Sequence, residues 1–132
     1  ISYGRAEVIY RGCKTAIMAV GASMEEGVKI YNKLRERGEN PTLINARFEN
    51  PVDEKLIEEL ADDHDKLLTV EENIGAGGFG MNVLRIVNEG GYDIKVVNAA
   101  LPDDYMAHGN VAKLKEMCGF TPDDIIKKLD RY

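Results

Sequence analysis

Two short apolar segments, each followed at once by polar or glycine-rich residues, constrain this chain more than any other feature. They span Thr42–Ala46 and Lys66–Val70, and the second continues as E-E-N-I-G-A-G-G-F-G up to Gly80. Buried apolar runs of this length are typical of parallel strands in an open α/β sheet. In such sheets, ligands bind beyond the carboxyl ends of the strands. We therefore expect any functional edge to lie where these two segments end.

Strands and helices alternate along the rest of the chain. Further apolar runs predict strands at Ala6–Tyr10, Thr15–Val20 and Ile94–Ala99. A short turn separates the first two runs, so we expect the first strand to run antiparallel to the second. Apolar residues at helical spacing fill the intervals between the later strands. The pattern predicts an α/β domain, a three-layer α/β/α sandwich around a five-stranded, mostly parallel mixed sheet with its first strand antiparallel.

Several helix starts carry capping signals. Ser23 with Glu26 three residues later reads as a capping box, and Asp53 can cap the helix that follows Pro51. Asn110 is the expected cap of a short helix through Met117. The final helix is expected to begin at T-P-D-D (residues 121–124), which combines a threonine cap, a proline at the first position and acids in the first turn.

Composition limits the class of protein. The chain has 132 residues, enough for one domain, and a net charge of −6, which argues against binding a nucleic-acid backbone. No apolar run has membrane-spanning length and no signal-peptide pattern occurs, so we expect a cytoplasmic protein without a membrane partner. Cys13 and Cys118 are expected to be free, buried thiols. Because Ile1 replaces the usual Met, we expect residues 1–132 to be a fragment of a longer chain.

Arg47 is the first candidate site residue, because it directly follows the segment Thr42–Ala46. Its planar guanidinium group could hold a phosphate or a carboxylate with two parallel hydrogen bonds. The alternative is a structural salt bridge with a nearby acid such as Glu49 or Asp53. The pattern alone favours the salt bridge.

Glu71, Glu72 and Asn73 follow the second segment and form the other candidate group, at a site edge or an interface. A general acid or base is one interpretation of the acids, and a helix cap or an interface contact is the favoured one. The glycine turn after Asn73 matches the dinucleotide spacing G-x-G-x-x-G only in part, so tight packing is favoured over an anion cradle. The histidines have no ligand spacing, which predicts no metal site, and no catalytic set of residues stands out.

Three motifs together resemble a known family. They are A-R-F-E-N-P-V-D (residues 46–53), H-D-K-L-L-T-V-E-E-N-I-G-A-G-G-F-G (64–80), and L-P-D with H-G (101–103 and 108–109). The combination resembles the C-terminal domain of 1-deoxy-D-xylulose-5-phosphate synthases, within the transketolase C-terminal domain family. The likeness covers nearly the whole chain. Asn50 and Tyr105 depart from it, since a basic residue and a phenylalanine are usual at these positions.

The resemblance implies a fold, an activity and partners. The full-length enzyme would be a homodimeric transferase that joins pyruvate to glyceraldehyde 3-phosphate with loss of carbon dioxide, using thiamine diphosphate and Mg²⁺, and it would feed isoprenoid and thiamine biosynthesis. The cofactor would lie between the two preceding thiamine-binding domains, so this domain alone is expected to bind no cofactor and to be inactive. In the family, the arginine that matches Arg47 helps to hold the substrate phosphate.

Two other interpretations remain open from the sequence. The chain could be the C-terminal domain of a transketolase or of the β subunit of a 2-oxoacid dehydrogenase, where its role would be largely assembly. It could also be a free-standing, flavodoxin-like binding module, which belongs to a different functional class.

Overall fold

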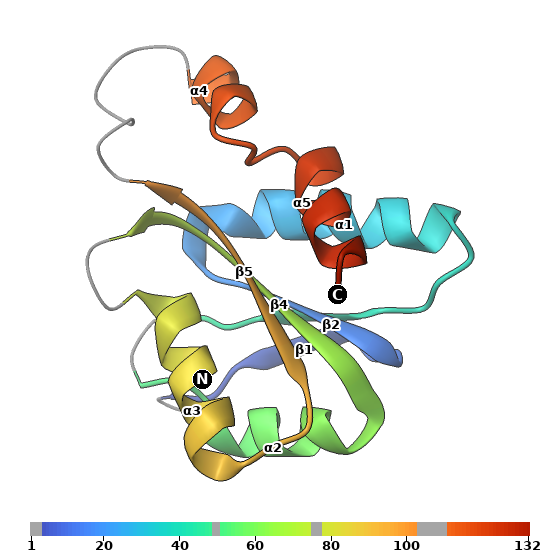
Figure 1. Cartoon of the computed structure of the whole chain (residues 1–132), viewed down its shortest axis with the longest axis vertical. Coiled ribbons are helices and arrows are strands. Elements are labelled where there is room, and N and C mark those ends of the chain that lie inside the picture. The colour runs from blue at the N-terminus through green and yellow to red at the C-terminus, as the bar shows by residue number, and fades with distance from the viewer. Residues whose placement is uncertain (1–3, 49–50, 75–77, 103–110) are drawn as a thin grey trace.

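A computed structural model describes residues 4–48, 51–74, 78–102 and 111–132, and Figure 1 shows its course. The strands are β1 (Glu7–Tyr10), β2 (Lys14–Ala19), β3 (Thr42–Asn45), β4 (His64–Ile74) and β5 (Lys95–Pro102). The helices are a short 3-10 turn η1 (Gly21–Ser23), α1 (Met24–Glu36), α2 (Glu54–Asp63), α3 (Phe79–Gly90), α4 (Val111–Met117) and α5 (Pro122–Asp130).

The strands described form one five-stranded sheet in the order β1-β3-β2-β4-β5. The pairs β2–β3, β2–β4 and β4–β5 are parallel, and β1 is antiparallel to β3. The predicted α/β fold, with a mostly parallel sheet and an antiparallel first strand, is therefore confirmed. The ladder partner of β1 is β3, whereas β2, which follows β1 in the chain, lies one strand further in.

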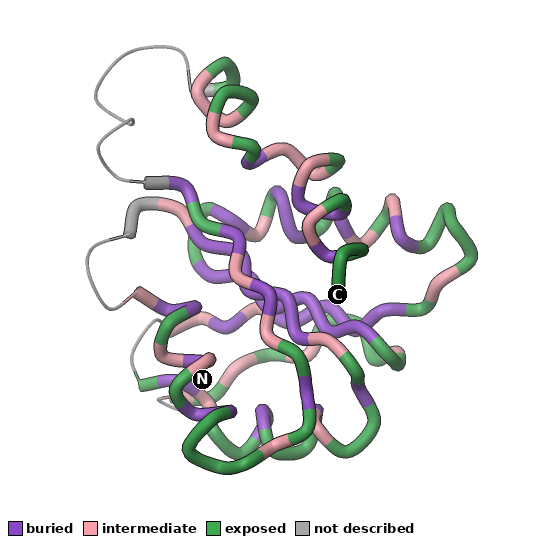
Figure 2. Tube along the Cα trace, viewed as in Figure 1, coloured by how far each residue is buried: buried purple, intermediate pink, exposed green. Residues whose placement is uncertain are grey.

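Two apolar cores form on opposite faces of the sheet, because side chains alternate along each strand. On β2, Ala16 and Met18 belong to one core while Ile17 and Ala19 belong to the other. Helices α2 and α3 cover the first face, and α1 and α5 cover the second (Figure 1). Buried positions accordingly concentrate along the strands in the middle of the molecule (Figure 2). This is the three-layer arrangement that the sequence predicts.

Two of the predicted helix caps form and one does not. Asp53 caps α2 by accepting a hydrogen bond from the backbone of Leu56, and Thr121 caps α5 in the same way through Asp124. The capping box at Ser23 is wrong. The Ser23 hydroxyl accepts from the N–H of Val20 at 3.1 Å and lies 2.6 Å from the carbonyls of Val20 and of Val70 on β4, either of which can take its single hydrogen, so it does not cap α1. The predicted cap at residue 110 lies outside the described residues.

Two strands are longer than their apolar runs. β4 extends to Ile74 and β5 to Pro102, because the polar end of β4 continues to pair in register, with Glu71 opposite Ala100 and Glu72 opposite Leu101. Glu71 and Glu72 therefore lie within the last residues of β4 and not after the strand. The two cysteines are free but not buried, since Cys13 is exposed and Cys118 is partly exposed.

Candidate functional site at the carboxyl edge of the sheet

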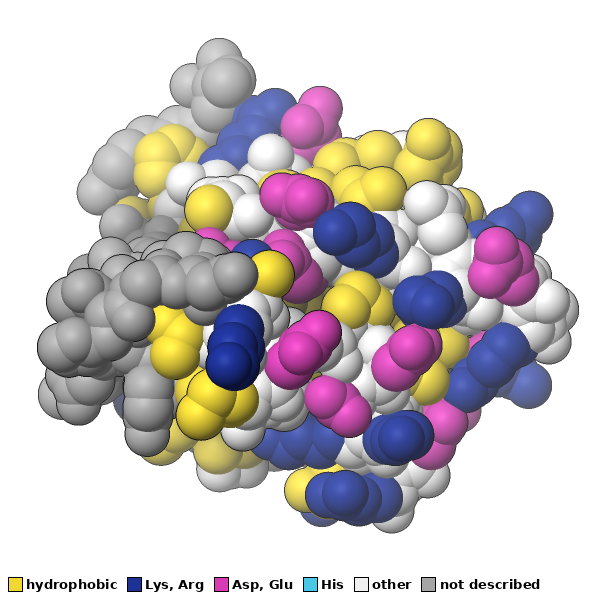
Figure 3. Space-filling view, turned by 90° about the horizontal axis from the view of Figure 1, so that it is seen from above, with side chains coloured by type: hydrophobic (Ala, Val, Ile, Leu, Met, Phe, Trp, Pro, Cys, Tyr) yellow, Lys and Arg dark blue, Asp and Glu magenta, His cyan; other side chains and the backbone are white. Residues whose placement is uncertain are grey.

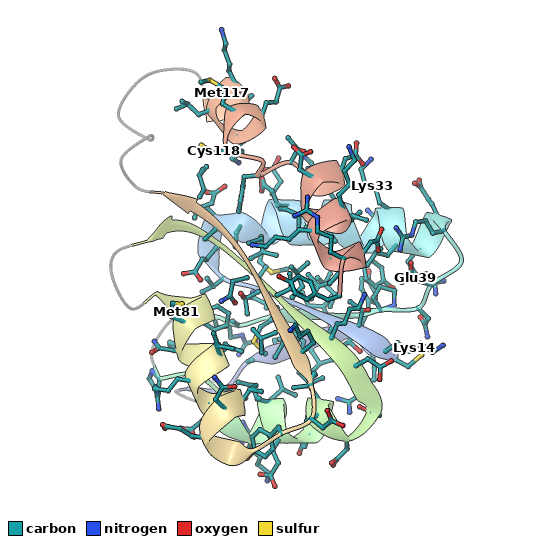
Figure 4. All side chains as sticks on the ribbon, in the orientation of Figure 1. Lys14, Lys33, Glu39, Met81, Met117 and Cys118 are labelled. Atoms are coloured by element: carbon teal, nitrogen blue, oxygen red, sulfur yellow. The ribbon has the colours of Figure 1, made fainter. Side chains whose placement is uncertain are left out.

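The candidate residues meet at one edge because the strands that carry them are parallel and in register. Ala19 of β2 is paired with Asn45 of β3 on one side and with Val70 of β4 on the other. Arg47 and Glu71, which follow these partners, therefore lie at the same edge, as the sequence predicts. In Figure 4 the labelled Met81 and Met117 lie toward this end of the molecule, and Lys14 and Glu39 lie at the opposite end.

Arg47 is held in an unusual backbone conformation. Its φ is 65°, in the left-handed region that residues with side chains seldom adopt, and its N–H donates to Asn45 Oδ1 at 3.0 Å. The guanidinium Nη2 lies 3.3 Å from Glu7 Oε1, and the Arg47 side chain is 23% exposed. The salt bridge expected with Asp53 does not form, because Asp53 caps α2 and lies beside Arg5 at 3.8 Å. Glu49 lies outside the described residues.

An open depression of about 500 Å³ lies beside Arg47. Its lining comes from β1, β3 and the turn after β2, namely Glu7, Gly21, Asn45, Arg47 and Phe48. The side chain of Glu7 is half exposed and therefore partly screened by solvent, so it neutralises the guanidinium group only in part. The depression can hold an anion against the free side of the guanidinium fork.

Glu71 has a structural partner in the helix that follows it. Its carboxylate accepts hydrogen bonds from the backbone N–H groups of Phe79, at 2.9 Å, and of Gly80. Glu71 is 3% exposed, and a negative charge at a helix N-terminus is favourable. Of the two favoured interpretations, a helix cap or an interface contact, these hydrogen bonds show the helix cap. Since the carboxylate occupies these N–H groups, the start of α3 does not present them to a bound anion.

Gly80 is required at this cap for steric reasons. A Cβ atom added there would lie 2.7 Å from Asn98 Oδ1 and 2.8 Å from both Glu71 Oε2 and Thr69 Oγ1. The interpretation that the glycine turn serves close packing therefore holds for Gly80.

Glu72 belongs to a second buried cluster. Lys115 of α4 lies 2.8 Å from Glu72 Oε1 and 2.5 Å from Glu26 Oε1 of α1. Burial alone would lower the pKa of Lys115, but its hydrogen bonds to the two carboxylates outweigh that effect and hold the pKa above its ordinary value. Glu72 is thus part of an internal ion cluster that joins β4, α1 and α4.

The structure brings the predicted residues to one edge without bringing them into a single site. Arg47 faces the depression, while Glu71 and Glu72 each have internal partners, and only the backbone of Asn73 is described. The sequence alone does not identify Glu7, Glu26 or Lys115 as partners of the candidate residues. Each lies far from its partner in the sequence, and no local spacing marks the pair. Among the described residues, no cluster of three or more His, Cys, Asp or Glu could hold a metal ion.

Figure 3 shows how charged side chains are distributed on one face of the molecule. On the face covered by α1 and α5, basic and acidic side chains are interspersed (Figure 3). Two ion pairs join these helices: Lys33 of α1 with Asp123 of α5, and Arg37, which caps the end of α1, with Asp130 of α5. No helix within the described ranges is long and apolar enough to cross a membrane.

The family model described as "Transketolase, C-terminal domain" matches residues 4–125 of the chain. Among curated proteins, 1-deoxy-D-xylulose-5-phosphate synthases from Shouchella clausii and Dehalococcoides mccartyi are both 37% identical, over 96% and 98% of this chain. The synthase from Lachnoclostridium phytofermentans is 36% identical over 99% of the chain. The chain spans about a fifth of the length of these relatives, since the alignments cover 20%, 20% and 21% of them.

Among solved structures, a chain described as "Split gene transketolase, inactive beta4 tetramer" superposes with a TM-score of 0.87. The match covers 99% of this chain and 43% of that one, at 24% sequence identity. At this identity the likeness supports the fold and nothing further.

Proposed function

Because this chain belongs to the transketolase C-terminal domain family, we propose that it is the C-terminal domain of a 1-deoxy-D-xylulose-5-phosphate synthase. The full-length enzyme would condense pyruvate with glyceraldehyde 3-phosphate, giving 1-deoxy-D-xylulose 5-phosphate and carbon dioxide. The observation that carries the proposal is the similarity of nearly the whole chain to synthases of that name. Such an enzyme would be a cytoplasmic transferase of isoprenoid and thiamine biosynthesis.

Thiamine diphosphate with Mg²⁺ would stabilise the carbanion formed when pyruvate loses carbon dioxide. We propose that preceding domains of the longer chain bind this cofactor, and that residues 1–132 form the one domain described above, inactive on its own. The start of α3 is the glycine-rich helix start that could otherwise receive a diphosphate, and Glu71 already accepts its first N–H groups. A diphosphate placed there would have to displace a buried carboxylate.

The role proposed for this domain is to hold the phosphate of glyceraldehyde 3-phosphate through Arg47. The guanidinium group is partly exposed at the ligand edge of the sheet and borders a depression large enough for a phosphate group. Asn45 fixes the backbone of Arg47 through its side-chain oxygen. The fixed backbone limits the positions that the guanidinium fork can occupy, which favours a planar, two-pronged contact with phosphate oxygens.

The second role proposed is contact with the preceding domains and, in a homodimer, with the partner subunit. Met81 on α3 is 58% exposed and Met117 on α4 is 71% exposed, toward the end of the molecule where β4 and β5 finish (Figure 4). Exposed methionines are common at surfaces that pack against a partner, because their flexible side chains adapt to it. This surface would cover the substrate side of the enzyme.

The test is Arg47→Ala in the full-length enzyme. A hydrogen bond to a charged group contributes roughly 1.5–3 kcal/mol, and about 1.4 kcal/mol corresponds to a tenfold change. We therefore expect kcat/KM for glyceraldehyde 3-phosphate to fall by about ten- to a hundredfold. The KM for pyruvate should be unchanged, because pyruvate has no phosphate group. Activity with an unphosphorylated aldehyde should fall much less.

A matched control is Arg85→Ala, which removes an exposed arginine paired with Glu89 on α3 and should leave both aldehydes unaffected. The competing explanation is that Arg47 only secures β1 through its pair with Glu7. In that case Arg47→Ala would lower the melting temperature and reduce activity with both aldehydes equally. That result would overturn the phosphate role.

A further inference from the structure

The cluster formed by Glu26, Glu72 and Lys115 joins three elements that are far apart in sequence. Glu26 lies in the first turn of α1, Glu72 near the end of β4 and Lys115 on α4. The side chains of the two acids are only 6% and 11% exposed, and that of Lys115 is 19% exposed. A cluster this well shielded from water is far stronger than a surface ion pair.

The cluster is unbalanced in charge. One ammonium group serves two carboxylates: Lys115 donates a hydrogen bond to Glu26 Oε1 and contacts Glu72 Oε1 as an ion pair at 2.8 Å. Among the residues that the structure describes, Glu26 Oε2 and Glu72 Oε1 are buried with no hydrogen-bond partner. If Lys115 were removed, two nearly buried carboxylates would face each other without a counter-charge, which is strongly unfavourable. Lys115 is therefore one of the contacts that keep the start of α1 close to the end of β4.

The start of α1 is also connected to the depression. The hydroxyl of Ser23, one turn before Glu26, lies 2.6 Å from the carbonyl of Val70 on β4. Gly21, at the first position of η1, lines the depression beside Arg47. The segment from Gly21 to Glu26 is thus secured to β4 at two points, by the Ser23 hydroxyl and by the Lys115 cluster.

We propose that Lys115 is a positioning residue, whose ammonium group holds the start of α1 against the end of β4 and so fixes the Gly21 wall of the depression that receives the substrate phosphate. Lys115 does not touch the substrate in this scheme. The inference rests on the phosphate role proposed for Arg47, but the holding of α1 against β4 can be measured separately.

The experiment uses the full-length enzyme with three variants at the cluster. Lys115→Met removes the charge at similar length and Lys115→Arg keeps it. Lys115→Met with Glu72→Gln removes the lysine together with one of the two carboxylates, so that Glu26 and residue 72 no longer repel each other. Lys33→Met is the matched control, because it breaks an ion pair between α1 and Asp123 of α5, away from the depression. The measurements are the melting temperature, kcat and KM for both substrates, and amide hydrogen exchange of residues 21–26.

For Lys115→Met we expect the KM for glyceraldehyde 3-phosphate to rise about five- to tenfold, corresponding to roughly 1 kcal/mol. The KM for pyruvate should stay the same, and residues 21–26 should exchange faster. Lys115→Arg should behave like the unmodified enzyme, and so should Lys33→Met. The double variant should regain the melting temperature and keep the raised KM, because its stability is restored and its link to α1 is not.

A double variant that regains both the melting temperature and the original KM would overturn the proposal, since Lys115 would then act only through stability. Unchanged exchange of residues 21–26 in Lys115→Met would also overturn it. If Lys115→Met yields too little folded protein, the KM and the hydrogen exchange of the double variant distinguish a positioning role from a role in stability alone. Failure of the phosphate role would appear separately, as an Arg47→Ala enzyme with unchanged kinetics.

Discussion

At the amino end of the sheet, polar groups are joined by hydrogen bonds, whereas the carboxyl end is built from charged groups. The hydroxyl of Thr42 on β3 accepts from the backbone N–H of Gly12 at 2.9 Å and lies 2.8 Å from His64 Nε2, at the start of β4. The other ring nitrogen of His64 contacts the Leu60 carbonyl and the Asp63 carboxylate. Each polar atom of this network has a partner, which is the usual condition of a buried structural network.

The carboxyl end departs from that condition. Glu26 Oε2 and Glu72 Oε1 are both buried there without a hydrogen-bond partner among the described residues. A positive φ does not distinguish the two ends, since Arg47 has one at the carboxyl end and Lys14 at the amino end. A buried carboxylate oxygen without a hydrogen-bond partner costs stability. The amino end thus satisfies its buried polar groups internally, whereas the carboxyl end leaves two carboxylate oxygens unsatisfied, at the edge where the phosphate and partner contacts are proposed.

The largest expected effect is a loss of stability from a substitution at the carboxyl end of the sheet. Gly80→Ala would place a methyl group within 2.8 Å of three oxygen atoms that belong to Thr69, Glu71 and Asn98. We expect a loss of about 3 kcal/mol in the free energy of unfolding, from overpacking and a displaced helix cap. Denaturant unfolding measures this, with the exposed neighbour Met81→Ala as a control of small effect. A loss below about 0.5 kcal/mol would show that the cap adapts easily.

A smaller effect is expected at the amino end. Thr42→Val keeps the shape of the side chain but leaves the Gly12 N–H without its acceptor and His64 Nε2 without its partner. We expect a loss of about 2 kcal/mol in stability with no change in kcat or KM of the full-length enzyme once it is folded. A selective change in KM for the phosphorylated aldehyde would contradict the division of roles between the two ends.

The smallest effect concerns an exposed ion pair on the helix layer, between the end of α1 and α5. Hydrogen bonds from Arg37 at the end of α1 lower the pKa of Asp130 on α5 below its ordinary value. A lowered folded-state pKa contributes stability above the unfolded-state value of 3.8, and the contribution disappears as the pH falls through the folded-state pKa. The two side chains are 43% and 47% exposed, so the contribution is under about 1 kcal/mol.

Asp130→Asn should therefore lower the melting temperature slightly near pH 7, and the difference from the unmodified protein should shrink as the pH is lowered below 3.8. Melting curves across this range provide the check. A difference that stays constant with pH would mean that the aspartate acts through its shape and not through its charge.

The sequence is a good guide to whatever is determined locally. Asp53 and Thr121 cap their helices because each needs only an N–H group three residues away. The same rule fails at Ser23, whose hydroxyl contacts a carbonyl 47 residues away on β4. A strand neighbour can therefore override a local capping signal.

The candidate site shows the same difference between features that local sequence determines and contacts between distant residues. The edge that carries Arg47 could be predicted, because parallel strands place their carboxyl ends together. The partners could not be predicted, since Glu7 pairs with Arg47 across an antiparallel edge and Glu26 meets Lys115 through a contact 89 residues apart. Pairings of this kind depend on strand order and helix docking, which no short motif encodes.

The direction of β1 has a consequence for how domains can be joined. Since β1 is antiparallel to β3, with Glu7 opposite Asn45, its first residue lies beside the depression and not at the far end of the sheet. Any polypeptide fused ahead of β1 would therefore be tethered at the ligand edge. A short tether there would keep a preceding domain at an effective concentration of the order of millimolar relative to this edge. A weak contact surface would then be enough to keep the two domains together.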